Sequence, residues 1–359
     1  MIKVDTPIKI GSYTLKNRIT FAPTVKFDFT DDSGMVTEKL VEHYVERAKG
    51  GCGLICVEAT AVTPGGRFGK NHMGLWCDEQ TEGHKRITEG CHQYGCVVII
   101  QLNHTGYTAN PECGPAIGPS SVTRQGFRGE YTTVEMTVDE IHEMQNAFVD
   151  AAVRAKEAGY DGVQLHGCHG YLINQFMSPV TNFRADEYGG SVENRARFGA
   201  EIMAQIRKEC GEDFLISIRT SGFDKDLEDA IAVAEEYVKA GCEYLQVSTG
   251  LSLLDTLKEF KDDKVKDVRS LGAFFKEHFD GRVPVSCVGG LKEAPEIEYL
   301  IEKEYVDTVD VARAILADPE FANALIEGKE FTKCYGCQAC QYGPFTAHKC
   351  PAEIVRLRK

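Results

Sequence analysis

Short apolar runs rich in valine and isoleucine recur along almost the whole chain, with amphipathic stretches between them. A strand without polar alternation is typical of a parallel sheet that is buried on both faces. The predicted strands are Ile19–Ala22, Leu54–Ala59, Val97–Leu102, Gly162–His166, Leu215–Thr220, Tyr244–Ser248, Val283–Val288 and Thr308–Ala312. The predicted helices between and after them are Thr37–Lys49, Glu79–Tyr94, Val138–Ala158, Glu193–Cys210, Glu228–Ala240, Lys266–Phe279, Ala294–Lys303 and Asp318–Ile326. This repetition predicts an α/β fold, a (β/α)8 TIM barrel.

The length of 359 residues suits a single barrel. Glycines such as Gly159 and Gly241 stand where helices should end before the next strand. The alternative is an open doubly wound sheet, which would normally carry a GxGxxG turn after an early strand, and the sequence has none after any predicted strand. We therefore predict a barrel over residues 1–330 and a short C-terminal cysteine-rich extension over residues 331–359.

Charge and hydropathy exclude several classes of protein. The net charge of -14 leaves no basic face to displace counterions from nucleic-acid phosphates. No apolar run approaches the roughly 20 residues of a membrane span, and the start, Met1–Asp5, lacks the apolar core of a signal peptide. We expect a cytoplasmic protein that binds neither nucleic acid nor membrane.

A dense group of reactive side chains follows the fourth predicted strand. His166, His169 and Tyr171 lie within six positions, where that strand ends and a loop begins. The long insertions, about residues 103–137 and 168–192, both fall on the C-terminal face of the barrel, where active sites form. Two hydrogen-bond donors beside a weak acid are suited to holding a carbonyl oxygen and delivering a proton next to it.

Other strand ends carry groups suited to a phosphorylated cofactor. Gln101 ends the third strand, and Arg219 ends the fifth. Gly289-Gly290 and Ala312-Arg313 follow the seventh and eighth strands, where backbone N–H groups form the usual phosphate site of a barrel. The residues alone predict such a cofactor over the barrel mouth without naming it.

Nearly the whole chain resembles the Old Yellow Enzyme family of FMN-dependent barrels. The matching segments are Ile8–Gly11, Leu15–Ile19, Glu58–Val62, Gln101–Gly106, His166–Phe176, Glu193–Arg195 and Arg197–Phe198. The resemblance implies an ene-reductase that binds FMN and reduces the activated C=C of an α,β-unsaturated carbonyl compound, such as an enone or enoate. NAD(P)H or a reduced carrier protein would supply the electrons.

The resemblance also implies a role for each site residue. Pro23, Thr24 and Ala59 would line the flavin, Gln101 would hydrogen-bond its pyrimidine edge, Arg219 would lie near N1 and the C2 oxygen, and Gly289, Gly290, Ala312 and Arg313 would bind the phosphate. His166 and His169 would hold the activating oxygen of the substrate. Tyr171 would protonate the α-carbon after hydride leaves flavin N5 for the β-carbon. Val25 and Ala312 depart from residues common in the family at these points.

Four cysteines gather at the C-terminal end. Cys334, Cys337 and Cys340 are spaced so that one tight loop presents three thiolates, and Cys350 supplies a fourth. A zinc site or an unliganded tail are the alternatives. The resemblance extends to the iron–sulfur branch of the family, which includes 2,4-dienoyl-CoA reductase and trimethylamine dehydrogenase, and it implies a [4Fe–4S] cluster here. The ten other cysteines are expected to be mostly small buried hydrophobes.

That branch usually continues into a second flavin and nicotinamide region, which we expect to be missing here. A separate flavoprotein or ferredoxin would then deliver electrons through the cluster, in the cytoplasm of an anaerobe. The alternative functions are an amine dehydrogenase or demethylase and an electron-transfer subunit, although a single tryptophan, Trp76, cannot form a multi-tryptophan cage for an amine. Whether the chain forms a homo-oligomer stays open. His104 is expected to be structural, and Arg195 and Arg197 to fix the signature loop through ion pairs.

Overall fold

The eight predicted strands form one closed parallel barrel. The structure, a computed structural model, describes residues 2–27, 29–126, 129–250, 259–337, 340 and 350–358. The barrel strands, in chain order, are β3 (Ile19–Phe21), β4 (Leu54–Ala61), β5 (Val97–Asn103), β10 (Gly162–Gly167), β11 (Leu215–Ser221), β12 (Tyr244–Ser248), β13 (Val285–Cys287) and β14 (Thr308–Val311). β14 pairs with β3 and closes the cylinder. The TIM-barrel prediction is confirmed, and the open-sheet alternative is excluded.

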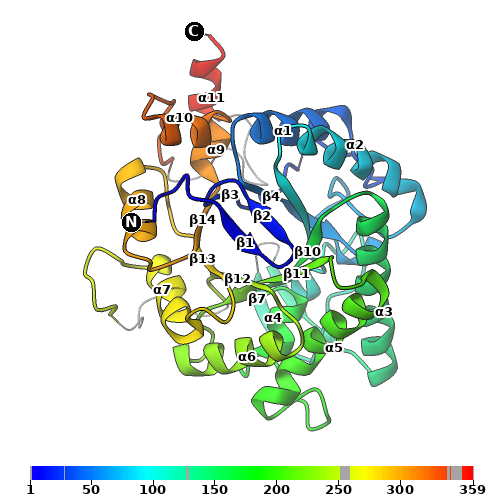
Figure 1. Cartoon of the computed structure of the whole chain (residues 1–359). Coiled ribbons are helices and arrows are strands. Elements are labelled where there is room, and N and C mark those ends of the chain that lie inside the picture. The colour runs from blue at the N-terminus through cyan, green and yellow to red at the C-terminus, as the bar shows by residue number, and fades with distance from the viewer. Residues whose placement is uncertain are drawn as a thin grey trace.

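Helices form a ring outside the strands (Figure 1). They are α1 (Glu38–Lys49), α2 (Thr81–His92), α3 (Val138–Glu157), α5 (Val192–Cys210), α6 (Leu227–Lys239), α7 (Val268–Phe279), α8 (Ala294–Glu302), α9 (Arg313–Ala317) and α10 (Phe321–Glu327). The predicted helix 318–326 is partly wrong, because Asp318 has an extended backbone between α9 and α10. Pro319 follows it and disfavours the helical conformation at the residue before it.

A short hairpin covers the N-terminal end of the barrel. β1 (Ile8–Ile10) pairs antiparallel with β2 (Tyr13–Leu15). Ile10 and Leu15 are fully buried, in one apolar cluster with residues of the barrel strands such as Leu54 and Val97. This end of the barrel is therefore filled by side chains, and the site must lie at the other end.

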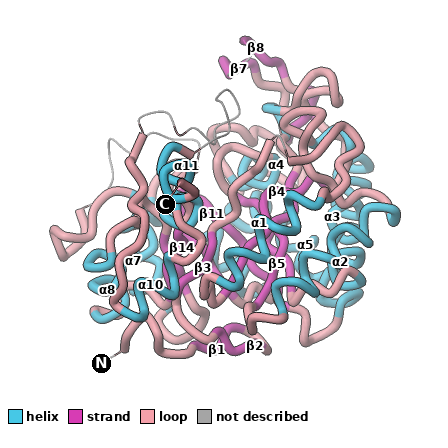
Figure 2. Tube along the Cα trace, turned by 90° about the horizontal axis from the view of Figure 1, so that it is seen from above, coloured by secondary structure: helices cyan, strands magenta, loops and turns pink. Residues whose placement is uncertain are grey.

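The opposite end carries the long insertions, and Figure 2 shows β7 and β8 projecting there, away from β1 and β2. The elements of these insertions are η3 (Gly106–Thr108), β6 (Ile117–Gly118), β7 (Thr123–Gly126), β8 (Gly129–Thr132), β9 (Val134–Glu135) and α4 (Leu172–Met177). Two more 3-10 turns, η1 (Pro64–Gly66) and η2 (Asp78–Gln80), follow β4, and α11 (Pro351–Arg356) contacts α9. None of these short elements was predicted, because each is too short to show a hydrophobic period.

Two arginines of α5, the buried Arg195 and the partly exposed Arg197, contact the loop that follows β10. Arg195 forms an ion pair with Asp229 at 2.5 Å and also donates to the carbonyl oxygen of Met177. Arg197 donates to the carbonyl oxygen of Glu187 at 2.7 Å. Both arginines thus contact the signature loop, but the predicted ion pairs do not hold it: the contacts are hydrogen bonds to backbone carbonyl oxygens, and the ion pairs join Arg195 to α6 and Arg197 to Glu201 of its own helix.

Three buried histidines should make the fold sensitive to acid. Burial lowers the pKa of His72, His84 and His104 to about 4 each, against roughly 6.5 in the unfolded chain. Between about pH 6.5 and about pH 4 these histidines are protonated in the unfolded chain but not in the folded protein. The free energy of unfolding therefore falls as the pH drops through this range. Glu58 acts in the opposite direction, because burial raises its pKa to about 7. These three histidines and Glu58 together contribute a loss of about 3 kcal/mol per pH unit near pH 5.

Denaturant unfolding of the protein between pH 5 and pH 7 measures this slope. His84→Gln should reduce it by about 1.4 kcal/mol per pH unit, since it removes one titrating group far from the barrel mouth. A free energy of unfolding that stays constant or rises on acidification contradicts the prediction.

In the part of the chain that the structure describes, no helix is long and apolar enough to cross a bilayer.

Candidate active site

The two histidines meet at the C-terminal end of β10. His166 lies within β10 opposite Arg219 of β11, and its Nε2 is 3.1 Å from Nδ1 of His169. His169 has a left-handed backbone, with φ 61, and Gly170 follows with φ 78. This turn reverses the chain immediately after the strand and brings the second imidazole back over the first. The predicted pairing of these residues is therefore present in the structure.

Both imidazoles are neutral at physiological pH. The pKa of His166 is lowered well below its ordinary value, first by burial and then by the charges of His169 and Arg219. The pKa of His169 is lowered by desolvation and by Arg219, although the residue reaches solvent at the barrel mouth. A neutral imidazole donates one hydrogen bond and accepts another, so the partners of each ring decide which nitrogen carries the proton.

Ser248, at the end of β12, is such a partner and was not predicted from the sequence. Its Oγ lies 2.9 Å from Nε2 of His169. A serine hydroxyl both donates and accepts. When the hydroxyl donates to Nε2, Nδ1 of His169 carries the proton and faces the same space as Nε2 of His166. Nδ1 then donates to Nε2 of His166 at 3.1 Å. An oxygen atom inserted between the rings would accept an N–H from each once His166 carries its proton on Nε2.

Tyr171 lies beside this pair, at the residue before α4. Its ring packs edge-on against His166, with centroids 4.6 Å apart, and against Phe68 on another side, with centroids 5.1 Å apart. Burial raises the pKa of Tyr171 well above its ordinary value. The phenol therefore stays protonated at neutral pH and is available as a weak acid.

Phe68 and His72 complete the wall of the site, and neither was predicted from the sequence. Nδ1 of His72 accepts from the backbone N–H of Phe68 at 3.3 Å. Its Nε2 must then carry the proton, which it donates to the carbonyl oxygen of Ala59 at 2.5 Å. His72 thus joins the Phe68 loop to the end of β4. No short motif marks this contact in the sequence, because Ala59 lies 13 positions before His72 in the chain.

Buried polar atoms below the histidines remain available to a bound group. Arg219 is 7% exposed, and its Nε has no hydrogen-bond partner among the described residues. Other buried polar atoms also have no hydrogen-bond partner within the described ranges: Oε1 of Gln246, Nε2 of Gln164 and both side-chain polar atoms of Asn103. Buried polar atoms without partners are rare in a folded protein and indicate a missing ligand or water.

The residues predicted to bind phosphate converge. Gly289 and Gly290 have φ values of +137 and +67, a backbone that side chains rarely adopt. A Cβ built on Gly290 would lie 3.6 Å from Nη2 of Arg313. Ala312 precedes α9, and Arg313 is its first residue and is exposed. Backbone N–H groups beside a guanidinium make a cradle of the right chemistry for a phosphate.

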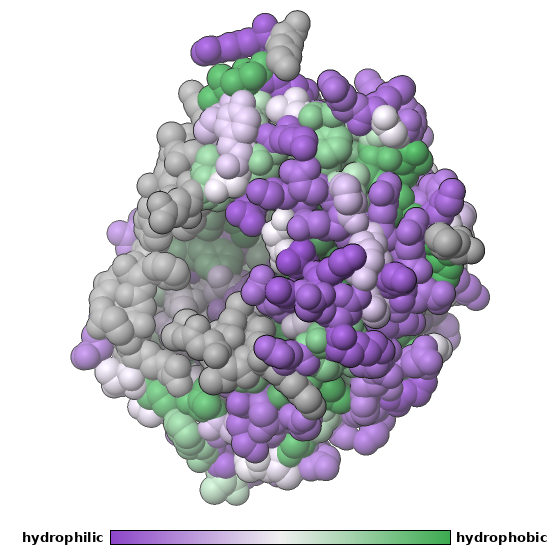
Figure 3. Space-filling model, turned by 90° about the vertical axis from the view of Figure 1, so that its left-hand side faces the viewer, coloured by the Kyte–Doolittle hydropathy of each residue, from purple (hydrophilic) through white to green (hydrophobic). Residues whose placement is uncertain are grey.

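The predicted flavin-lining segment is held by a buried carboxyl group. Pro23 and Thr24 follow β3 and are half-buried. The backbone N–H of Lys26, two residues on, donates to Glu58 at 3.0 Å, next to Ala59 in the chain. The unsatisfied atoms, the glycine cradle and this segment together fit a flavin phosphate that lies over the mouth. Figure 3 shows one face of the molecule hollowed, with hydrophobic side chains on the floor of the hollow.

Gln101 lies inside the barrel with 1% exposure. Its Nε2 donates to Oε1 of Gln164 at 2.6 Å, so its amide oxygen faces elsewhere. His104 is also buried, and its Nδ1 accepts from the N–H of Gly106. His104 therefore supports the loop after β5, as predicted.

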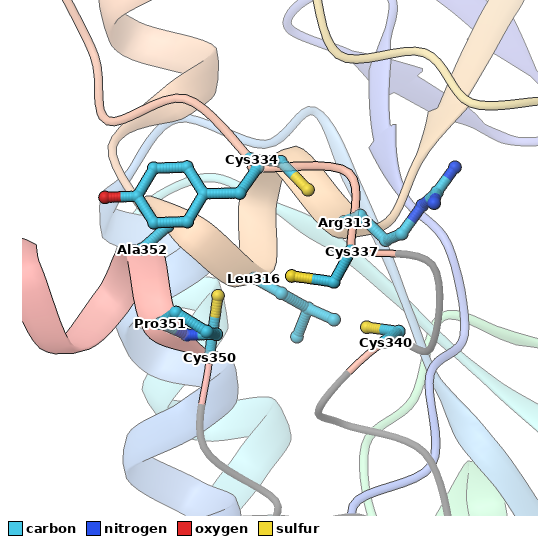
Figure 4. A pocket seen from close by; sticks show the side chains of 9 residues that line it. Arg313, Leu316, Cys334, Cys337, Cys340, Cys350, Pro351 and Ala352 are labelled. Carbon is cyan, nitrogen blue, oxygen red and sulfur yellow. The ribbon is translucent and has the colours of Figure 1, made fainter.

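The four predicted metal ligands surround one pocket. Cys334, Cys337, Cys340 and Cys350 line it together with Leu316 of α9 and the start of α11. Figure 4 shows the four sulfur atoms facing a common space, while the guanidinium of Arg313 points away from it. The N–H of Gly336 donates to Sγ of Cys334 at 3.5 Å, which closes the turn between the first two cysteines. Residues 338–339, between the second and third cysteines, and residues 341–349, between the third and fourth, lie outside the described residues.

Fold and site together are those of a barrel with a donor pair, a phenol and a glycine cradle at its C-terminal mouth, features that fit the class of flavin-binding barrels. Residues 3–331 match the NADH:flavin oxidoreductase / NADH oxidase family. The chain belongs to this family, which is the Old Yellow Enzyme family.

Two relatives in this family differ in length and in the activity for which they are named. The chain is 35% identical over 350 residues to an NADH oxidase of Thermoanaerobacter brockii, covering 92% of this chain and 52% of that protein. It is 35% identical over 323 residues to an NADPH dehydrogenase of Bacillus subtilis, covering 89% of this chain and 93% of that protein. The chain thus spans about half the length of the first relative and nearly all of the second.

Solved structures of other proteins superpose on this fold. A 2-naphthoyl-CoA reductase superposes with a TM-score of 0.86 at 27% identity, covering 94% of this chain and 54% of that one. Morphinone reductase superposes with a TM-score of 0.77 at 26% identity, covering 92% of each chain. The four tail cysteines lie beyond residue 331, where the match to the family ends, so the match assigns them no role.

Proposed function

We propose that this protein is an FMN-dependent ene-reductase that saturates the C=C bond of an α,β-unsaturated carbonyl compound. The observation that carries the proposal is the neutral pair His166 and His169, 3.1 Å apart, with the protonated phenol of Tyr171 against it. Two aligned N–H donors polarise a carbonyl oxygen and make the β-carbon electrophilic. A tyrosine on the same side can then protonate the α-carbon.

The remaining residues of the site would bind the FMN and tune its reactivity. Bound FMN would supply the hydride from its N5 to the β-carbon of the substrate. Arg219 would place its positive charge below the histidines, where it favours an anionic ring system. Gly289, Gly290 and Arg313 would hold the phosphate, and Ala312 would shape its edge. Pro23, Thr24 and Ala59 would line the ring, and Gln101 would face its pyrimidine edge.

An anaerobic assay tests this function. The purified protein should contain about one FMN per chain, released by denaturation because no covalent link is proposed. Reduced enzyme should consume simple enones and enoates, observed as loss of the conjugated carbonyl absorbance. Failure to turn over any electron-poor alkene in such a panel contradicts the proposal, and flavin that stays attached to the denatured chain favours an amine dehydrogenase instead.

Ser248 should act as a positioning residue. Ser248→Ala removes the group that can select the Nδ1–H tautomer of His169, and we expect kcat/KM for an enone to fall about fivefold, the effect of one orienting hydrogen bond of roughly 1 kcal/mol. Ser248→Thr keeps the hydroxyl and should retain activity within about twofold. An alanine variant that equals the wild type shows that Ser248 does not orient His169.

We further propose that Cys334, Cys337, Cys340 and Cys350 hold a [4Fe–4S] cluster. The facing sulfur atoms and the three-residue spacing support a cubane. Iron, zinc and sulfide analysis of protein prepared without oxygen decides between iron–sulfur and zinc. Cys337→Ser should remove the iron without removing FMN.

The electron donor follows from the same preparation. The near-complete coverage of an NADPH dehydrogenase supports direct reduction by NAD(P)H, whereas the cluster supports delivery from a ferredoxin or a flavoprotein. Stopped-flow mixing with NADH or NADPH separates these routes, since rapid bleaching of the flavin removes the need for a partner. An oxygen-labile cluster would place the protein in the cytoplasm of an anaerobe.

A further inference from the structure

Cys168 lies between the two site histidines and has no part in the proposed reduction. One nitrogen of His166, one of His169 and Sγ of Cys168 all lie within 4.8 Å of one another. Two imidazoles and a thiol at this separation form a set of three potential metal ligands.

The backbone holds this set in place before any ion arrives. The N–H of His169 donates to the carbonyl oxygen of Thr249 at 3.2 Å, and the N–H of Tyr171 donates to that of Cys168 at 3.3 Å. The left-handed conformation of His169 turns its ring toward His166. Before the cysteine, Gly167 pairs with Thr220 of β11. The chain is thus fixed on both sides of the cysteine, so that binding an ion costs little ordering of the chain.

Burial and protonation suit a bound cation as well. Cys168 is 0% and His166 is 5% exposed, whereas His169 reaches solvent and gives an ion a route in. Nδ1 of His166 is buried without a partner among the described residues, so it can take the ring proton when Nε2 binds a metal. Burial raises the pKa of the Cys168 thiol, so the ion must displace the thiol proton on binding, as a coordinating metal does. Arg219 opposes a cation here, and the thiolate so formed offsets that charge together with Asp224.

We propose that His166, Cys168 and His169 form an inhibitory site for a thiophilic divalent cation of the Zn²⁺ class. The ion binds the thiolate and one unprotonated nitrogen of each imidazole, and the thiol proton passes to water. Three protein ligands leave the fourth tetrahedral position to a water molecule. No electron transfer is involved.

The consequence for activity rests on the proposed function. The same two histidines cannot coordinate a metal and donate hydrogen bonds to a substrate carbonyl at once. Zinc should therefore compete with the enone, raising the apparent KM and leaving kcat unchanged.

A binding experiment tests the site without any turnover. Chelator-treated holoenzyme is titrated with ZnCl2 by calorimetry, and wild type is compared with Cys168→Ala. Wild type should bind one Zn²⁺ more per chain than the variant, whatever the tail cysteines bind in both. Cys242→Ala, which removes another buried cysteine (4% exposed), should match the wild type. Equal zinc stoichiometry in wild type and Cys168→Ala overturns the proposal.

A kinetic experiment tests the competition, with 2-cyclohexen-1-one as substrate. The inhibition constant for Zn²⁺ should rise at least tenfold in Cys168→Ala, because loss of even an outer partner of a metal ligand typically costs about 10–100-fold in affinity. Cys168→Ser is the second variant if alanine reduces FMN content or thermal stability. Zinc that lowers kcat without raising KM, or that inhibits wild type and both variants equally, contradicts the proposal. If no enone is reduced at all, the proposed function fails while the titration still decides the metal site.

Discussion

Replacing Tyr171 with phenylalanine should slow the reduction of an enone at least about 100-fold, because a positioned general acid typically contributes 10²–10⁴-fold. The substitution removes one hydroxyl and keeps the ring that packs against His166 and Phe68. The pKa of this phenol is raised by burial, so the wild-type residue holds its proton until the substrate takes it. The loss should therefore appear in kcat, with little change in KM.

Single-turnover kinetics locate the effect. Reduction of the bound flavin by its donor needs no proton from Tyr171 and should proceed at the wild-type rate in Tyr171→Phe. Reoxidation of the reduced enzyme by an enone should carry the whole loss. A variant slowed equally in both half-reactions, or in neither, shows that Tyr171 is not the acid.

Replacing His166 with alanine should lower kcat/KM for an enone by about 10²–10³-fold, the usual cost of losing one donor to a developing oxyanion. The loss should exceed that of Ser248→Ala, because His166 donates directly whereas Ser248 acts through His169. Substrate binding and turnover should both suffer, since the carbonyl oxygen is held before and during hydride transfer. His169→Ala should behave in the same way.

His84→Ala is the matched control. His84 is equally buried, and its ring contacts Gly74 and Tyr160 away from the barrel mouth. Its replacement should lower the thermal stability and leave kcat/KM near wild type in the folded protein. Equal loss of activity in His84→Ala and His166→Ala assigns the effect to misfolding instead of to a lost donor.

Much of the site was predictable because a parallel barrel translates chain order into position. His166, Arg219, Gly289 and Arg313 each lie at or just after the C-terminal end of a strand, and all those ends meet on one face. The roles of the lining residues Pro23, Thr24, Ala59 and Gln101 came from resemblance, and they stay predictions for a flavin-loaded structure to test.

The site residues that were not predicted from the sequence all depend on partners elsewhere in the chain. Ser248, Phe68 and His72 act through contacts to partners on other segments, such as the 2.9 Å contact of Ser248 with His169 across 79 positions. An isolated serine or histidine in a sequence carries no sign of such a partner. The same holds for Cys168, whose position beside two imidazoles depends on the left-handed turn at His169.

The amino-acid order alone determined the barrel and the set of strand ends that form its mouth, because buried parallel strands need continuous apolar runs and closure then decides their neighbours. Tertiary structure decided the chemistry of individual atoms: which imidazole nitrogen bears a proton, which polar atoms are left without partners, and which sulfur atoms face one another. These properties depend on distances of about 3 Å between side chains far apart in the chain, and hydrophobic periodicity carries no information at that scale.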